Sequence, residues 1–313
     1  MQIISNIYYF IILLFVFSVS SAQNGSSNHV SKVNLFSETI LLHNIKTISS
    51  DSFEGRRTGT LGAVKTKKYI INSFKSFDVK PLGKNYEQTF SFLDKGKYYH
   101  AVNVLGVIQG TTFPKSYVVI SAHYDHEGIK RGVIYNGADD NASGLSALFS
   151  LAEYFKNNPP KHSVILAAFD GEELGLKGSK HFVKNSIVPI KDIMINFNLD
   201  MISRSADNKL FAVGTSYSKT LEEVILTTKH SKKINLVTGH DNKKDWRNDW
   251  TYSSDHASFH KKGIPFLYFG VVDHEDYHKP TDDYENINPE FYIEAVKSII
   301  SVFEKVDDLQ MKR

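Results

Sequence analysis

The sequence contains no cysteine among its 313 residues. Disulfide bonds, thiolate zinc sites and a lipid-modified N-terminal cysteine are therefore excluded. The stability of the protein must come from a packed core, to which a bound metal can add. Any metal ligands in this chain must be imidazoles or carboxylates.

The sequence also lacks a strong excess of charge of either sign. Its formal net charge is +3, its pI is about 8.7 and its basic residues are scattered. Nucleic-acid binding normally requires a concentrated basic face, so we expect no nucleic-acid partner. The length suits one large α/β domain or two small ones, with room for a sizeable core.

A long hydrophobic run occurs only at the start, where residues 7–17 are followed by small residues up to Ala22. The run has the length of a signal-peptide core, and its Ser-x-Ala ending fits the cleavage rule. We therefore predict a signal peptide over residues 1–22, a flexible lead over 23–36, and a secreted or periplasmic mature chain that starts at Gln23 without a membrane span. Because no Lys or Arg precedes the run, an uncleaved membrane anchor is the alternative.

Strands and helices alternate along the rest of the chain. Apolar runs predict buried strands at 103–110, 117–122, 163–169, 193–198, 210–214 and 264–270. Amphipathic spacing and capping residues predict helices at 37–48, 63–77, 144–157, 174–184 and 221–230, and a last helix that opens at Asn288-Pro289.

This alternation is typical of an α/β protein, a three-layer α/β/α sandwich with a mostly parallel, mixed sheet. Residues 79–99 are expected to form a loop and a short strand. We predict one domain over residues 37–313, in which residues 37–100 extend the same fold.

His123 and Asp125 follow the strand predicted at 117–122. Side chains two residues apart on an extended segment point the same way, so Asp125 can hold one imidazole nitrogen while the other binds a metal. A structural hydrogen bond at a strand end explains this pair equally well when it is considered alone.

Asp139 and Asp140 precede the helix predicted at 144–157, whose N-terminus favours anions. Considered alone, this segment is best explained by helix capping through Asn141 or Asp140. Asp140 can instead bridge two cations, because a carboxylate has two oxygens and the metals of paired sites lie ~3.5–4 Å apart.

Three further polar segments follow. Adjacent Glu172 and Glu173 point in different directions, so one can bind metal while the other transfers protons, although a lone Glu-Glu pair is more often an exposed helix start. Asp200 ends an apolar run and His278 lies in a turn-rich loop, which alone would suit solvated residues. The combination of two histidines and three acids, all at strand ends or loop edges, indicates a two-metal hydrolytic centre.

Together, these motifs resemble the secreted co-catalytic zinc aminopeptidases, the family typified by the Streptomyces and Aeromonas (Vibrio) enzymes. The motifs appear in the family's order: His-x-Asp at 123–125, Gly-Ala-Asp-Asp-Asn-Ala-Ser-Gly at 137–144, Gly-Glu-Glu at 171–173, Asn-Leu-Asp-Met at 198–201 and Tyr-His at 277–278. The similarity spans roughly residues 103–286. The segment Phe53-Glu-Gly-Arg56 also resembles N-terminal segments of bacterial members.

The resemblance implies the zinc exopeptidase fold and two Zn²⁺ ions per chain. One ion would be bound by His123, Asp140 and Asp200. The other would be bound by Asp140, Glu173 and His278, so that Asp140 bridges the two.

The resemblance also assigns roles beyond the ligands. Glu172 would be the general acid and base, taking a proton from a metal-bridged water and giving it to the leaving amine, while Tyr277 would stabilise the oxyanion. Asp125 would orient His123, and the peptide bond between Asp140 and Asn141 would be cis.

We therefore predict a hydrolase, a zinc metallopeptidase that acts as an aminopeptidase on peptides with a free N-terminus. A dipeptidase or carboxypeptidase with the same centre is the first alternative. A glutaminyl cyclase, a related transferase with one zinc, would not need both His123 and Asp200. A non-catalytic binding module of this fold would lose ligands, whereas all five ligands and Glu172 are present.

The remaining conspicuous residues receive structural predictions. Ser253 to His256 is expected to begin a helix and not to form a catalytic triad. Surface positions are predicted for Arg204, His126, His240, His260 and His274, and packing roles for Trp246 and Trp250.

Overall fold

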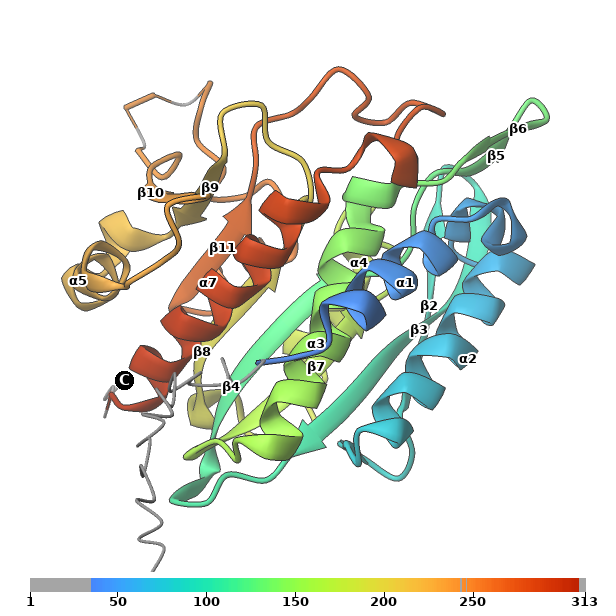
Figure 1. The fold of residues 1–313 in the computed structure, drawn as a ribbon. Helices are drawn as coiled ribbons and strands as arrows, with labels where there is room; N and C mark the ends of the chain where they lie inside the picture. Colours follow the sequence, from blue (N-terminus) through green and yellow to red (C-terminus); the bar gives the residue numbers. More distant parts are fainter. Residues whose placement is uncertain (1–34, 243, 246, 310–313) are drawn as a thin grey trace, which may run out of the picture. The chain divides into compact units, whose positions relative to one another are not determined.

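A mixed sheet runs through the part of the chain that this computed structural model describes, residues 35–242, 244–245 and 247–309. Its strand order is β1-β3-β7-β4-β8-β11-β9-β10, with β2 paired to β3 (Figure 1). The strands are β1 Lys80–Pro81, β2 Glu87–Asp94, β3 Lys97–Ile108, β4 Phe113–His123, β7 His162–Phe169, β8 Ile193–Leu199, β9 Lys209–Val213, β10 Asn235–Thr238 and β11 Phe266–Gly270. A separate small hairpin pairs β5 Gly128–Lys130 with β6 Val133–Tyr135.

The four central strands, β7, β4, β8 and β11, are parallel to one another. Every residue of β7 and β8 is buried, as expected for parallel strands that are covered on both faces. Antiparallel pairs flank this centre, with β3 on β7 on one side and β9 on β11 on the other. The predicted α/β class and the mostly parallel mixed sheet are therefore confirmed.

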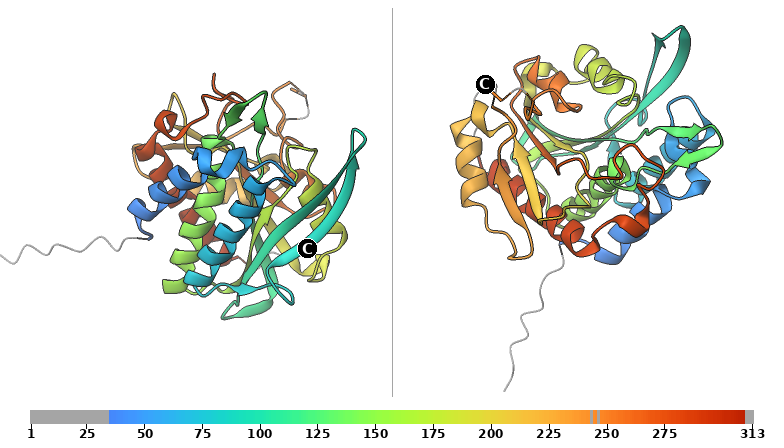
Figure 2. Two further views of the ribbon diagram at one scale, coloured as in Figure 1. Left: turned by 90° about the vertical axis from the view of Figure 1, so that its right-hand side faces the viewer. Right: turned by 90° about the horizontal axis from the view of Figure 1, so that it is seen from above.

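Helices cover both faces of the sheet (Figures 1 and 2). Along β4, Val118 and Ile120 belong to one core and Val119 to a second core on the opposite face. The helices of the first core are α1 Glu38–Ile48, α2 Leu61–Ser76, α3 Gly144–Asn157, α5 Lys219–Thr227 and α7 Pro289–Asp307. Those of the second core are α4 Lys177–Lys184 and α6 His256–His260. Short 3₁₀ or irregular turns lie at Asp51–Arg56, Ala138–Ser143, Ile190–Asp192, Thr215–Tyr217 and Tyr284–Asn286.

Capping residues set the helix starts that the sequence predicted. The Ser37 side chain accepts a hydrogen bond from the Ile40 N–H at the start of α1. Asn288 accepts one from the Phe291 N–H, and Pro289 occupies the first turn of α7. By contrast, α4 begins at Lys177 and not at residue 174, because Gly175 and Leu176 adopt left-handed backbone angles, with φ of 95° and 57°.

Residues 79–99 differ most from the prediction. They form β1, β2 and the start of β3, and the hairpin of β2 and β3 reaches beyond the sheet's edge (Figure 2). The hairpin is stabilised by aromatic pairs across its strands, such as Phe92 and Tyr99, whose ring centroids lie 5.2 Å apart. Because polar residues are interspersed in this segment, its apolar pattern was too weak to predict two long strands.

The predicted signal peptide over residues 1–22 lies outside the described residues, as does most of the predicted lead. Phe36, at the end of that lead, is buried in the first core. Within the described ranges, no helix has both the length and the apolar character needed to cross a bilayer.

Parallel strands bring their carboxyl ends to the same edge of a sheet, where ligands bind in open α/β folds. Here β4 ends at His123 and β8 is followed directly by Asp200, while the loop after β7 carries Glu172 and Glu173. The sheet therefore brings the polar segments after β4, β7 and β8 to one edge, as the sequence motifs require for a common site.

Candidate metal centre

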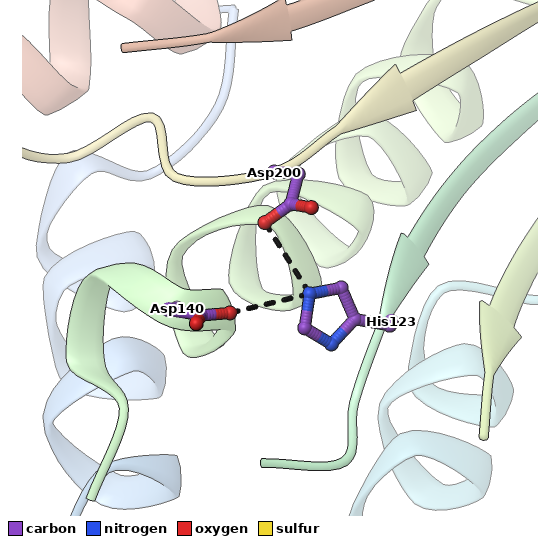
Figure 3. Close-up of side chains that lie close together, drawn as sticks. All are labelled: His123, Asp140 and Asp200. Carbon is purple, nitrogen blue, oxygen red and sulfur yellow. Dashed lines mark hydrogen bonds and ion pairs between the residues drawn. The ribbon is translucent and has the colours of Figure 1, made fainter. Parts of the chain in front are cut away.

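Three side chains meet at the carboxyl ends of β4 and β8 (Figure 3). His123 is the last residue of β4, Asp140 lies in the loop before α3, and Asp200 follows β8. The His123 Nε2 atom is 3.3 Å from Asp140 Oδ1 and 3.3 Å from Asp200 Oδ1. All three side chains are nearly excluded from solvent.

The second oxygen of Asp140 faces a different imidazole. His278 Nε2 is 3.1 Å from Asp140 Oδ2 and 3.4 Å from Glu173 Oε2. The two oxygens of Asp140 are therefore shared between His123 and Asp200 on one side and Glu173 and His278 on the other. The five residues predicted as ligands come together around one carboxylate.

The spacing of these donor atoms fits zinc. Two donors ~2.1 Å from one ion in tetrahedral directions are ~3.4 Å apart. The separations between imidazole and carboxylate atoms are 3.1–3.4 Å in both groups, which is close to that value. The Glu173 Oε1 atom is also buried without a hydrogen-bond partner and faces His126 Nδ1 at 2.9 Å, and a bound cation would add to its contacts.

The loop that carries Asp140 is held by hydrogen bonds to its backbone. The Asp282 carboxylate accepts from the N–H groups of Asp139 at 2.9 Å and Asp140 at 3.0 Å. The Asn141 amide donates to the Leu199 carbonyl at 2.9 Å, which ties the loop to the end of β8. The peptide bond between Asp140 and Asn141 is cis, as the resemblance implies.

The neighbouring acid, Asp139, points away from the centre. Its Oδ1 accepts from both the backbone N–H and the hydroxyl of Ser203, each at 2.7 Å. Its Oδ2 lies 3.2 Å from His274 Nε2. The predicted surface position of His274 is therefore wrong, because its ring joins Asp139 to the loop that carries His278. The two adjacent acids therefore have different roles: Asp140 is one of the candidate donors, and Asp139 holds the surrounding loops in place.

Asp125 supports the site in a different way from the prediction. His123 Nδ1 lies 3.0 Å from the backbone carbonyl of Asp125 but 3.9 Å from its carboxylate. The carboxylate instead accepts from the N–H groups of Glu172 at 3.0 Å and Glu173 at 3.3 Å. Asp125 therefore orients His123 mainly through its backbone and uses its side chain to fix the Gly-Glu-Glu loop.

Glu172 and Glu173 occupy electrostatically different environments. Burial raises the pKa of Glu172 well above its usual range, and nearby carboxylates such as Asp200 add to the shift against the opposing effect of His123. Burial would also raise the pKa of Glu173, but its contacts with His126 and His278 lower it to about 2. Carboxyl groups whose pKa values are pushed apart in this way are typical of a division between proton transfer and ligation.

A cleft of about 610 Å³ opens onto this centre, within the range of small-molecule sites. Tyr277 stacks on His278 with ring centroids 3.9 Å apart, and Trp250 stacks on His240 at 3.7 Å. Trp250 therefore packs against the fold, as predicted, and also lines the cleft; Trp246 lies outside the described residues. The lining comprises His123, Asp140, Glu172, Glu173, Gly175, Leu176, Asp200, Met201, Arg247, Asp249, Trp250, Tyr252, Ser253, Tyr268, Val271, Asp273, Tyr277 and His278.

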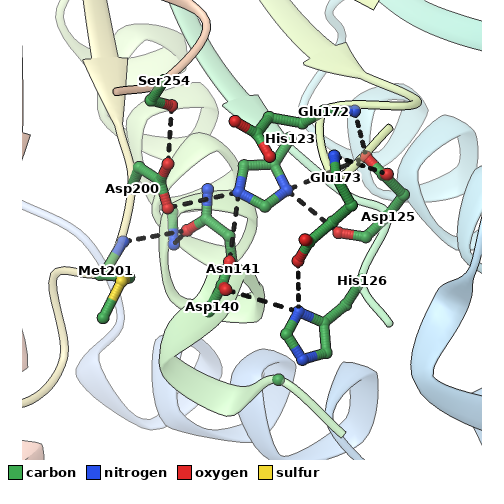
Figure 4. Close-up of polar contacts among 12 residues, drawn as sticks. His123, Asp125, His126, Asp140, Asn141, Glu172, Glu173, Asp200, Met201 and Ser254 are labelled. Atoms are coloured by element: carbon green, nitrogen blue, oxygen red, sulfur yellow. Dashed lines mark hydrogen bonds and ion pairs between the residues drawn. The ribbon is translucent and has the colours of Figure 1, made fainter. Parts of the chain in front are cut away.

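Several supporting residues were not recognised from the sequence, and two of them, Ser254 and His126, are shown in Figure 4. Ser254 donates to Asp200 Oδ2 at 2.6 Å and lies in the segment Ser253 to His256 that was predicted to begin a helix, and α6 begins at the last residue of that segment. The Tyr268 hydroxyl reaches the Asp200 carbonyl, at 3.4 Å. His126 is fully buried beside Glu173, so its predicted surface position is wrong. Arg204 is partly buried and pairs with Asp276 at the edge of a neighbouring cleft.

Arg56, from the segment Phe53-Glu-Gly-Arg, is completely buried near the carboxylates of the candidate metal centre, such as Asp140. Its guanidinium donates to the carbonyls of Tyr124 at 3.0 Å, Ile48 at 3.0 Å and Gly137 at 2.8 Å, and also to that of Asn136. Burial lowers the Arg56 pKa to about 10, although carboxylates led by Asp140 oppose the shift. Arg56 thus ties together the backbone segments next to the His-x-Asp and Gly-Ala-Asp-Asp motifs.

Comparison with known proteins places these motifs in a family. A model of peptidase family M28 matches residues 103–303. The Bacillus subtilis aminopeptidase YwaD is 31% identical over 204 residues, and the alignment covers 60% of this chain but 41% of that relative's length.

Solved structures show the fold. A Zn-dependent exopeptidase from Parabacteroides distasonis superimposes with a TM-score of 0.71 at 18% identity, covering 86% of this chain and 98% of that one. The Porphyromonas gingivalis glutaminyl cyclase superimposes with a TM-score of 0.68 at 19% identity, covering 87% and 99%. Enzymes with different names therefore share this fold.

The contacts of Arg56 predict a large loss of stability on its removal. We expect Arg56→Met to lower the free energy of unfolding by about 3–5 kcal/mol, because buried carbonyls lose their donor and buried carboxylates lose a nearby positive charge. Arg57→Met is the matched control, since Arg57 is partly exposed and pairs with Glu127, and it should cost less than about 1 kcal/mol. Urea denaturation measures both values; equal small losses would show that Arg56 does not support the site.

Proposed function

The chain belongs to peptidase family M28, a zinc metallopeptidase family, and from this membership and the geometry of the site we propose that it is a di-zinc aminopeptidase of the Streptomyces and Aeromonas type. It would remove N-terminal residues from peptides that have a free N-terminus. The proposal concerns the number of ions and the end of the peptide that is cleaved, because the family and the fold leave both open.

The observation that carries the proposal is the position of Asp140. Its Oδ1 lies 3.3 Å from His123 and its Oδ2 lies 3.1 Å from His278, so each oxygen belongs to a separate donor group. Bridging carboxylates of this kind hold two metal ions close together. His123 and Asp200 would complete one site, and Glu173 and His278 the other.

The chain's own residues can then divide the remaining work. Bound zinc would supply Lewis acidity to the scissile carbonyl and to the attacking water. Glu172 lines the cleft with a raised pKa, which suits a group that accepts a proton from water and returns it to the leaving amine. Tyr277 also lines the cleft and can donate a hydrogen bond to the oxygen that gains negative charge.

The lining of the cleft supports selectivity for a free α-amine. Beyond the donor carboxylates it contains Asp249 and Asp273 against one cationic side chain, Arg247, and this excess of acidic groups would attract a cationic amine. Trp250, Tyr252 and Tyr268 add apolar surface that can contact the side chain of the first residue.

Glutaminyl cyclase activity is the alternative that the fold comparison raises. The complete set of five donor residues, Asp140 and the four around it, supports a two-ion centre more than a one-ion centre. We propose that the peptidase reaction takes place outside the cytoplasm, on the basis of the sequence pattern of residues 1–22.

Metal analysis combined with a substrate panel tests the activity. The panel contains one peptide with a free N-terminus, its N-acetylated form and a peptide with N-terminal glutamine. We expect two zinc ions per chain and cleavage of free N-termini only, because acetylation removes the charge that the acidic cleft would attract. One zinc ion with cyclisation of glutamine would instead identify a cyclase.

The role of Glu172 is tested separately. Because an amide cannot accept the proton, we expect Glu172→Gln to reduce kcat by at least ~10²-fold and to leave the zinc content unchanged. Glu222→Gln, at an exposed position on α5, is the control and should behave like the wild type. Loss of zinc from the Glu172 variant would reassign this residue as a ligand.

Export is tested on the protein recovered from its producing cells. Mass spectrometry of the N-terminal peptide should show a mature chain that starts at Gln23, because the small-residue rule places the cleavage after Ala22. An intact Met1 in a membrane fraction would favour the uncleaved anchor.

A further inference from the structure

A second imidazole lies against the donors of the second ion. His126 is fully buried, and its Nδ1 atom is 2.9 Å from Glu173 Oε1 and 3.6 Å from Asp140 Oδ2 (Figure 4). These three atoms form a compact group of the kind that can hold a cation. The prediction from sequence treated His126 as an extra surface histidine, and no ligand role was assigned to it.

Ordinary hydrogen bonding does not account for the position of this ring. Both nitrogens of His126 and the Glu173 Oε1 atom are buried without a hydrogen-bond partner, and His126 Nδ1 and Glu173 Oε1 face each other as an ion pair at 2.9 Å. Buried polar atoms without partners are costly and uncommon in folded proteins. A cation placed among Nδ1 and the two carboxylates would satisfy the facing atoms together.

The backbone leaves room for the ring at this point. A Cβ atom on Gly137 would lie 2.5 Å from His126 Cγ and 2.5 Å from its Cδ2. Gly137 also has a φ of +57°, a conformation that other residues rarely adopt. The glycine of the Gly-Ala-Asp-Asp motif therefore makes space for His126 directly beside Asp140.

We propose that His126 is a further protein ligand of the second ion, together with Asp140, Glu173 and His278. This inference rests on the proposed two-ion function. It makes the sites unequal, because the second would have two imidazoles and the first only His123. His126 follows β4 and is buried, whereas the His278 side chain is 37% exposed on a loop. His126 would therefore hold the second ion from the buried side of the site, opposite the partly exposed His278.

Zinc affinity measured by competition with chelators of graded strength tests the proposal on the full protein. We expect His126→Ala and His126→Gln to weaken binding of the second ion by more than ~100-fold, beyond the usual effect of a residue that only orients a ligand. Binding of the first ion should persist in both variants. His43→Ala, an exposed position on α1, is the control and should bind both ions like the wild type.

The glutamine variant separates the two possible roles of the ring. Its amide can donate a hydrogen bond to Glu173 but is a poor zinc ligand, so wild-type affinity in His126→Gln would overturn the proposal. A second ion retained by His126→Ala at wild-type affinity would also overturn it.

Proton NMR of the Co²⁺-loaded wild type gives an answer that requires no variant to fold. Each ligating imidazole contributes one exchangeable, strongly shifted N–H signal, so we expect three signals, from His123, His126 and His278. Two signals together with two bound ions would reject His126 and leave the proposed function intact. Binding of a single ion, with the same affinity in the His126 variants, would reject both the two-ion function and this ligand.

Discussion

The burial of several carboxylates at one point is the constraint on which this structure depends. Asp125, Asp140, Glu173 and Asp200 lie close together and nearly out of contact with water. Dehydrating one such ion costs several kcal/mol unless other charges or hydrogen bonds compensate. Backbone N–H groups, histidines and Arg56, the one Arg or Lys side chain buried within the described ranges, provide part of this compensation. Bound cations would provide the rest, so metal binding and folding of these loops are expected to be coupled.

A second set of carboxylates positions the first set through backbone contacts. Asp282 binds the N–H groups of the Asp140 loop, Asp125 binds those of the Gly-Glu-Glu loop, and Asp139 binds Ser203 and His274. Each of these side chains joins loops that follow different strands. Such support fixes the direction in which a ligand's oxygen points, which matters for metal affinity as much as the ligand itself.

The fold is shared by zinc peptidases and glutaminyl cyclases, so the activity must be inferred from the site. Two donor groups around Asp140, a protonatable Glu172 and an acidic cleft together support the aminopeptidase proposal. A third imidazole at His126 would add a feature that neither the fold nor the motif order specifies. The number and direction of donor atoms therefore carry more functional information here than the architecture does.

The sequence by itself determined the central strands, the main helices and the order of the polar motifs, because buried strands and capped helices leave local patterns. It also indicated the five candidate donors and Glu172 as a group, through their positions after apolar runs or in turn-rich loops and through the motif order that resembles the zinc aminopeptidases. The tertiary structure decided which atoms face one another: it gave Asp125 a backbone role toward His123, turned Asp139 away from the centre and buried His126 beside Glu173. It also showed that Arg56 links segments up to 81 positions away. Local periodicity reports whether a residue is buried, but the direction of a side chain in a loop depends on distant segments that packing brings into contact.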